Sequence, residues 1–193
     1  MSFFDRPDDV WLTPQVQGYR PPAPPSGATA RAIGVVRALA GSSRATVTLI
    51  LTRVVPDGFE FDIEVQLRRP QPDSVLDSEG DRWVPFYMDD LGALPKDDLP
   101  DYVFRLGIEY PGGGRTSTLP WTKQRHSAPV TPLLIGLHGG GLPDVYRESF
   151  WITPLPPPGA VKFVVEWPAG GVHEQGTAVP ASTILSALAG SDV

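Results

Sequence analysis

The sequence predicts an all-β fold, an antiparallel β-sandwich of about eight short strands with one short C-terminal helix. Prolines and glycines, 23 and 20 of the 193 residues, are almost twice as frequent as in an average protein, and a proline inside a helix costs about 3 kcal/mol. Residues 59–68 alternate strictly between apolar and polar side chains, as a strand with one buried face does. No helical pattern of about ten residues separates the expected strands, so a parallel α/β architecture is disfavoured.

The first expected strands lie in the N-terminal half of the chain. Residues 32–39 form a short apolar run, and residues 46–55 are dense in β-branched side chains. A Pro-Asp-Gly segment, residues 56–58, favours a tight turn in which the glycine tolerates a positive φ. Together with residues 59–68 it predicts a hairpin, one face of whose second strand is buried while the other is solvated.

Strand signals continue in the C-terminal half. The alternation restarts over residues 102–110 and ends at the glycines of residues 112–114. The glycines of residues 139–141 are expected to form a loop between two strands. The other segments with short apolar or alternating runs are residues 83–87, 132–137, 149–155 and 161–167, with residues 172–179 as an edge strand.

Residues 180–189 are the one segment that predicts a helix. Pro180 suits the first helical position, and Gly190 stands where a helix ends. Ile184, Leu185 and Leu188 form one apolar stripe at helical spacing.

The chain divides into a proline-rich N-terminal arm, residues 1–27, and a β-sandwich domain, residues 28–193. The run Pro-Pro-Ala-Pro-Pro at residues 21–25 favours a stiff polyproline II spacer. Phe3, Phe4 and Trp11 are the candidate interaction residues of the arm, as anchors in a groove of a partner protein. The alternative is a tail that lies on the surface of the domain.

Composition excludes several classes of function. There is no cysteine, which excludes disulfides, thiolate metal sites and cysteine nucleophiles and fits a reducing compartment. The net charge of -6 opposes binding to a phosphate backbone, so no nucleic-acid partner is expected. The acidic N-terminus is unlike a signal peptide, and no apolar run is long enough to span a bilayer, so we expect a cytoplasmic protein with no membrane partner.

One segment resembles part of a catalytic motif. His138 and the three following glycines come directly after an apolar run, as in esterases whose HGGG segment donates backbone N–H groups to an oxyanion. The accompanying G-x-S-x-G nucleophile elbow is missing, and so is the order of acid and histidine after it. A structural role for the glycines is therefore expected.

Metal and acid–base sites are not indicated either. His126, His138 and His173 are too far apart in sequence to share a strand or helix face. The acidic residues between 73 and 101 do not follow the EF-hand pattern, and whether they bind calcium is left open. Glu166 lies between Val165 and Trp167, where alternation predicts a solvent-facing side chain. No catalytic, cofactor-binding or metal-ligating residue, and no cofactor, is expected.

The C-terminal segment resembles a known group of sequences. The residues concerned are F-W-I-T-P-L-P-P-P-G at 150–159, F-V-V-E-W-P at 163–168, then Gly171, Val172 and Glu174, and P-A-S-T-I-L at 180–185. They resemble the C-terminal part of a group of uncharacterised actinobacterial proteins. The resemblance implies one structural unit from residue 150 on, consisting of a strand, a proline corner, a strand, an edge strand and a helix. It implies no activity, cofactor or catalytic residue.

These observations predict a non-catalytic β-sandwich that binds a protein partner whose identity is unknown. One alternative is a hydrolase whose site forms only in three dimensions, around His138 or Glu166. Another is a homo-oligomeric structural subunit that docks through its N-terminal arm.

Overall fold

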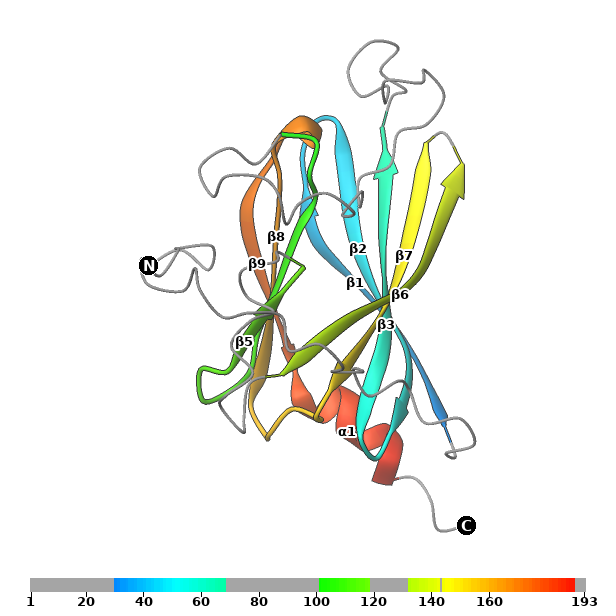
Figure 1. Ribbon diagram of the computed structural model, residues 1–193, viewed down its shortest axis with the longest axis vertical. Coiled ribbons are helices and arrows are strands. Elements are labelled where there is room, and N and C mark those ends of the chain that lie inside the picture. The colour runs from blue at the N-terminus through cyan, green and yellow to red at the C-terminus, as the bar shows by residue number, and fades with distance from the viewer. Residues whose placement is uncertain (1–29, 69–100, 119–131, 143, 190–193) are drawn as a thin grey trace, which may run out of the picture.

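The computed structural model describes residues 30–68, 101–118, 132–142 and 144–189. Two antiparallel sheets pack face to face and are followed by one short C-terminal helix, so the prediction of an all-β, sandwich-like fold is confirmed (Figure 1). The elements, in chain order, are β1 (Arg31–Gly41), β2 (Ala45–Val55), β3 (Gly58–Leu67), β4 (Arg105–Glu109), β5 (Arg115–Ser117), β6 (Leu133–Leu142), β7 (Val145–Thr153), β8 (Ala160–Trp167), the 3₁₀-helix η2 (Pro168–Gly170), β9 (Val172–Pro180) and α1 (Ala181–Ala189).

The first sheet has five strands in the order β1-β2-β3-β7-β6, and the second has four in the order β5-β4-β8-β9. All described strand pairs are antiparallel. The edge position expected for residues 172–179 is confirmed, because β9 ends the four-stranded sheet. Strand β5 was not predicted, since three residues show no alternation that a sequence pattern can detect.

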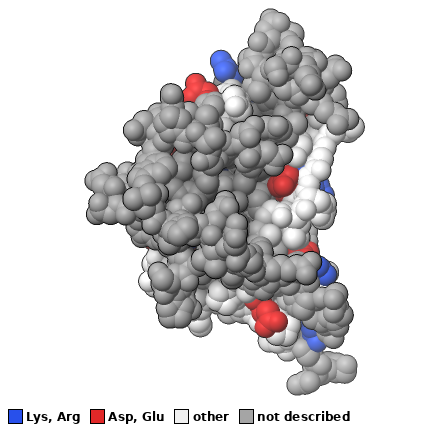
Figure 2. Space-filling model, viewed as in Figure 1, with Lys and Arg blue, Asp and Glu red and all other residues white. Residues whose placement is uncertain are grey.

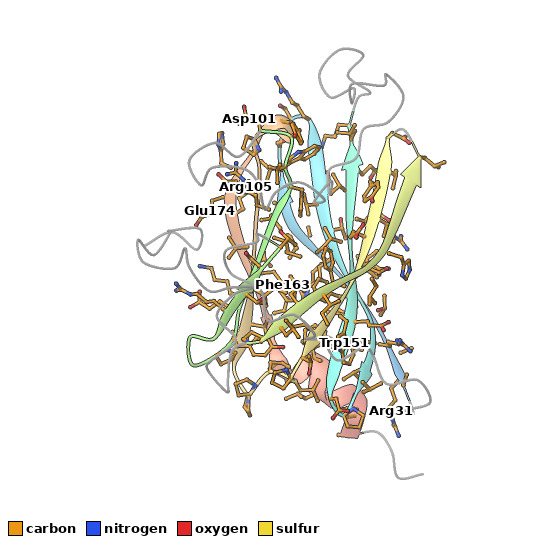
Figure 3. All side chains as sticks on the ribbon, in the orientation of Figure 1. Arg31, Asp101, Arg105, Trp151, Phe163 and Glu174 are labelled. Carbon is orange, nitrogen blue, oxygen red and sulfur yellow. The ribbon has the colours of Figure 1, made fainter. Side chains whose placement is uncertain are left out.

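The core lies between the sheets and is built from the alternating positions of the strands. Phe59, Phe61, Ile63 and Val65 of β3 are fully buried. Phe61 stacks on Phe150 of β7, with ring centroids 5.4 Å apart, and meets Phe163 of the other sheet edge-on at 5.5 Å. Figure 3 labels Phe163 between the two sheets. Aromatic contacts across the gap therefore join the two layers.

The predicted β2–β3 hairpin is present, but the role expected for Gly58 is wrong. The turn consists of Pro56 and Asp57, and Gly58 is the first residue of β3, without a positive φ. A Cβ atom on Gly58 would overlap the Ile152 carbonyl oxygen and lie 2.7 Å from the ring of Trp151. Glycine is required there because the backbone of β7 and an indole ring both approach closely, and only the tertiary structure brings them to this place.

The expectation of a loop at residues 139–141 is also wrong. Strand β6 continues through Gly139, Gly140 and Gly141 to Leu142, and pairs with β7 along this whole length. Glycines weaken a strand, and at an edge they mark places where other atoms approach the backbone closely. The residues of β7 opposite these glycines show which atoms those are.

Candidate functional site

Three polar side chains meet on the outer face of the five-stranded sheet. Asp62 of β3 pairs with Ser149 of β7, which in turn pairs with His138 of β6. The Ser149 hydroxyl donates a hydrogen bond to Oδ1 of Asp62 at 2.7 Å, and its Oγ lies 3.4 Å from Nε2 of His138. Serine, histidine and aspartate are thus adjacent although they are far apart in the chain.

Their connectivity differs from that of a catalytic triad. In a triad the histidine lies between the serine and the acid, so that it accepts the serine proton while the acid orients it. Here Ser149 lies between His138 and Asp62, and its proton is directed to the carboxylate. Asp62 accepts the hydrogen bond of the Ser149 hydroxyl and His138 is exposed, so the order of the three groups is not that of a triad.

Arginines neutralise the other acids on this face. Arg147 donates to Glu64, and its Nη1 lies 3.8 Å from Oδ2 of Asp62. Arg53 binds Glu60 through two hydrogen bonds. The outer face therefore carries charges that are already paired with each other.

The structure does not bring His138 and Glu166 together. Glu166 lies on the outer face of the four-stranded sheet, between the buried residues Val165 and Trp167, and accepts a hydrogen bond of 2.6 Å from Arg105. His138 lies on the outer face of the other sheet. Residues on opposite outer faces cannot form one acid–base pair.

The two ends of the five-stranded sheet differ. At β1, Gly41 exchanges two hydrogen bonds with the side chain of Gln175 of β9, and the Leu39 carbonyl accepts one from Thr177. These bonds tie the C-terminal end of β1 to the opposite sheet. At the other end, no strand of the described chain pairs with the outer side of β6.

This edge, called the open β6 edge because no described strand pairs with its outer side, has an unusual sequence. Its ten residues, Leu133–Leu142, include four glycines and no lysine, arginine, aspartate or glutamate. Natural sheet edges are protected by charges, prolines or bulges, and β6 has only one register shift, between Gly136 and His138. Figure 2 shows the described surface over β6 and β7, at the right of the view, as mostly uncharged with an isolated acidic group.

Glu148 is the charged group of β7 that points to the inner face. It pairs with Ile63 of the core on one side and with Gly139 on the other. Its Oε1 would lie 3.7 Å from a Cβ atom on Gly136, and its Oε2 occupies the place that a side chain on Gly139 would need. The glycines of β6 thus make room for the Glu148 carboxylate.

The surroundings of Glu148 change its acidity. The Tyr146 hydroxyl donates a hydrogen bond of 3.1 Å to Oε2 of Glu148. Partial burial raises the pKa of Glu148 above its usual range, against smaller opposing effects of the Tyr146 hydrogen bond and of His138. Burial, aided by the neighbouring carboxylate, also raises the pKa of Tyr146 to about 12.

Trp151 occupies a special position on the outer face. Its register places it beside Glu60 and Ile135, yet the residue is only 1% exposed (Figure 3). Nε1 of Trp151 is buried and has no hydrogen-bond partner in the described part of the chain. Because neighbouring strand residues alternate in direction, Trp151 lies on the outer face and Ile152 on the inner face.

The remaining predicted sites lie partly outside the described residues. Phe3, Phe4, Trp11 and the whole arm do so, as do His126 and the acidic segment up to residue 100. Within the described ranges, no three histidine, aspartate or glutamate residues are grouped so that they would hold a metal ion. No helix in these ranges is long and apolar enough to cross a bilayer.

Sequence reasoning missed Glu148 and the Asp62–Ser149 contact. One signal was present: Tyr146, Glu148 and Phe150 share one strand face, and a carboxylate between two aromatic residues interrupts an apolar pattern. The contact of Asp62 with Ser149 gave no signal, because strand order decides which residues pair.

Comparisons with known proteins assign the chain to no family. No model of a protein family, no curated protein and no solved structure matches the chain. The resemblance of the C-terminal segment to actinobacterial sequences stays a prediction. The fold and the β6 edge are therefore the ground on which a function is proposed.

Proposed function

We propose that the protein is a non-catalytic binding module, which takes up an extended peptide segment by strand addition to β6. The open β6 edge carries this proposal. A strand at the end of a sheet presents unpaired N–H and C=O groups, which form main-chain hydrogen bonds with an added strand. A cytoplasmic location belongs to the same proposal and is supported by the cysteine-free composition.

The contrast between the two edges supports the choice of β6. Side chains of β9 already bind the Leu39 and Gly41 backbone at one end of β1, and Arg31 and Arg37 place charges along the rest of that strand. On β6, three consecutive glycines and an absence of charged residues leave the backbone open to close approach. Leu142, at the end of this strand, is 72% exposed and offers an apolar contact to an added segment.

The arrangement of Asp62, Ser149 and His138 favours binding over hydrolysis. We expect Ser149→Ala and His138→Ala to hydrolyse a panel of p-nitrophenyl esters at the rate of the wild-type chain, which itself does not exceed the rate in buffer. A turnover that Ser149→Ala abolishes would instead support the hydrolase alternative.

Strand addition is tested with peptides selected from a display library against the full chain. Each selected peptide is then made with backbone N-methyl groups on its odd or on its even residues. Only one set removes the N–H groups that face β6, so we expect one set to lose binding and the other to keep it. Binding that survives both methylation patterns would show that main-chain pairing is not used.

The homo-oligomer alternative makes a different prediction. If the arm docks into a second copy, removal of residues 1–27 converts an oligomer into a monomer. We expect the molecular mass in solution to be that of a monomer both with and without these residues, as measured by sedimentation equilibrium.

A further inference from the structure

We propose that the β6 site selects a lysine or arginine in its partner, and that Glu148 recognises this side chain across Gly139. The inference rests on the proposed strand addition and says which peptides the β6 site prefers. It predicts which residue of the partner matters, namely the one that pairs with Gly139.

The geometry follows from the register. Glu148 and Gly139 are paired, so they share the inner face of the sheet. A residue of an added strand opposite Gly139 has its side chain on this same face, whether the strand runs parallel or antiparallel. Two strand spacings separate its Cα atom from that of Glu148 by about 10 Å, a gap that two long side chains can bridge.

Gly139 leaves room for the Glu148 carboxylate to reach over β6. A side chain at this position would overlap Oε2 of Glu148 and come within 2.6 Å of the Tyr146 hydroxyl. Because glycine has none, the carboxylate leans over β6 toward the open edge. A cation from the far side of β6 therefore reaches the carboxylate without displacing any side chain of the described residues.

The charges around Glu148 favour a basic residue in the partner. Among the described residues, no lysine or arginine forms an ion pair with Glu148, whereas Glu60, Glu64, Glu109 and Glu166 each bind an arginine. A partly buried carboxylate without a cation is unfavourable, and a partner's ammonium or guanidinium group relieves this cost. The net charge of -6 favours the approach of a basic segment.

A second copy of the chain is a poorer occupant of this edge. If two β6 strands paired around Gly139, two Glu148 carboxylates would lie on one face of the joined sheet. Their Cα atoms would be about 14 Å apart, three strand spacings, but both carboxylates lean toward the shared edge, so their like charges oppose association. Glu148 therefore disfavours self-pairing while it favours a basic peptide.

The test uses the full chain and three acetylated peptides of alternating valine and threonine, which differ only at the central residue: lysine, norleucine or glutamate. Affinities are measured by isothermal titration calorimetry. We expect the lysine peptide to bind about tenfold more tightly than the norleucine peptide, about 1.4 kcal/mol, and the glutamate peptide to bind most weakly. Glu148→Gln keeps the shape of the side chain and should abolish the preference for lysine. Asp144→Asn, an equal loss of charge at the β6–β7 turn, should retain it.

Each outcome decides between the two proposals. Equal binding of the lysine and norleucine peptides to the wild-type chain would overturn the role of Glu148 and leave strand addition intact. If neither these peptides nor any library peptide binds, the proposed function itself is overturned. Self-association of the wild-type chain that the lysine peptide reverses would show that a second copy is the true occupant of β6.

Discussion

Some glycines of the described chain are needed for the space beside them and not for backbone freedom. Gly58 and Gly141 do not have a positive φ, but a Cβ atom on either would overlap neighbouring atoms. At Gly141 these atoms belong to the backbone of Val145 and Tyr146, which cannot rotate away. A Cβ atom on Gly140 would have no atom of another described residue beyond its chain neighbours within 4 Å.

Two adjacent glycines therefore allow a matched comparison. We expect Gly141→Ala to lower the free energy of unfolding by about 1–3 kcal/mol, because overpacking moves the backbone of the β6–β7 turn. Gly140→Ala should change it by less than about 0.5 kcal/mol. Urea denaturation of both variants measures the difference, and equal effects would contradict the close approach at Gly141.

Two buried tryptophans differ mainly in one hydrogen bond. Trp151 and Trp167 are each 1% exposed, but only Trp167 donates its Nε1–H, to the Tyr102 carbonyl at 3.1 Å. Replacement by phenylalanine removes a similar volume at either site. We expect Trp167→Phe to destabilise the protein by about 1 kcal/mol more than Trp151→Phe, since a satisfied hydrogen bond is lost only there. Thermal unfolding followed by circular dichroism tests the order, and the reverse order would contradict it.

At the scale of elements, the sequence patterns predicted where the strands lie better than they predicted how long the strands are. Strict alternation located β3, and the apolar stripe of Ile184, Leu185 and Leu188 located α1. The pattern over residues 132–137 predicted only the first half of β6. Its second half is glycine-rich and has no intrinsic strand preference, so pairing with β7 determines its conformation.

The position of each strand in its sheet predicts its stability. Strand β3 is central and paired on both sides, whereas β6 is paired only with β7 in the described chain. We expect the amides of β3 to exchange with deuterium only on global unfolding. Alternate amides of β6 should exchange much faster, because their N–H groups face the open edge. Equal protection of all β6 amides in two-dimensional NMR spectra would show that the edge is covered.

At the scale of the whole molecule, polar bonds join the two sheets at one end of the β1–β2 hairpin. The Ser42 hydroxyl accepts hydrogen bonds from the backbone N–H groups of Arg44 and Ala45 and donates one of 2.6 Å to the Gly170 carbonyl of η2. A single hydroxyl thus orders the β1–β2 turn and attaches it to the other sheet.

Removal of this hydroxyl should loosen the attachment. We expect Ser42→Ala to lower the free energy of unfolding by about 1–2 kcal/mol, because three hydrogen bonds lose their partner. The neighbouring exposed residue gives the control, and Ser43→Ala should have almost no effect. Chemical denaturation of both variants provides the measurement; a Ser42→Ala variant as stable as the wild type would contradict this role.

Alkaline pH should destabilise the whole fold through two tyrosines. Burial raises the pKa of Tyr110 well above its usual value, and it raises that of Tyr146 to about 12. In the unfolded chain both ionise near pH 10. The contribution of the two tyrosines to the free energy of unfolding should therefore be fully present below pH 10. It should fall as the pH rises further, since only the unfolded chain readily loses these protons. Tyr110→Phe should weaken this dependence; an unchanged slope between pH 10 and 12 would contradict the assignment.

The sequence by itself determined the fold class, most strands and the terminal helix, because alternation, turn residues and proline density act over short distances along the chain. Only the tertiary structure decided that Ser149 donates to Asp62, that Gly58 faces Trp151, and that Glu148 leans over Gly139 at an open edge. These contacts depend on strand order and register, which follow from packing between residues far apart in the chain and leave no local pattern in the sequence.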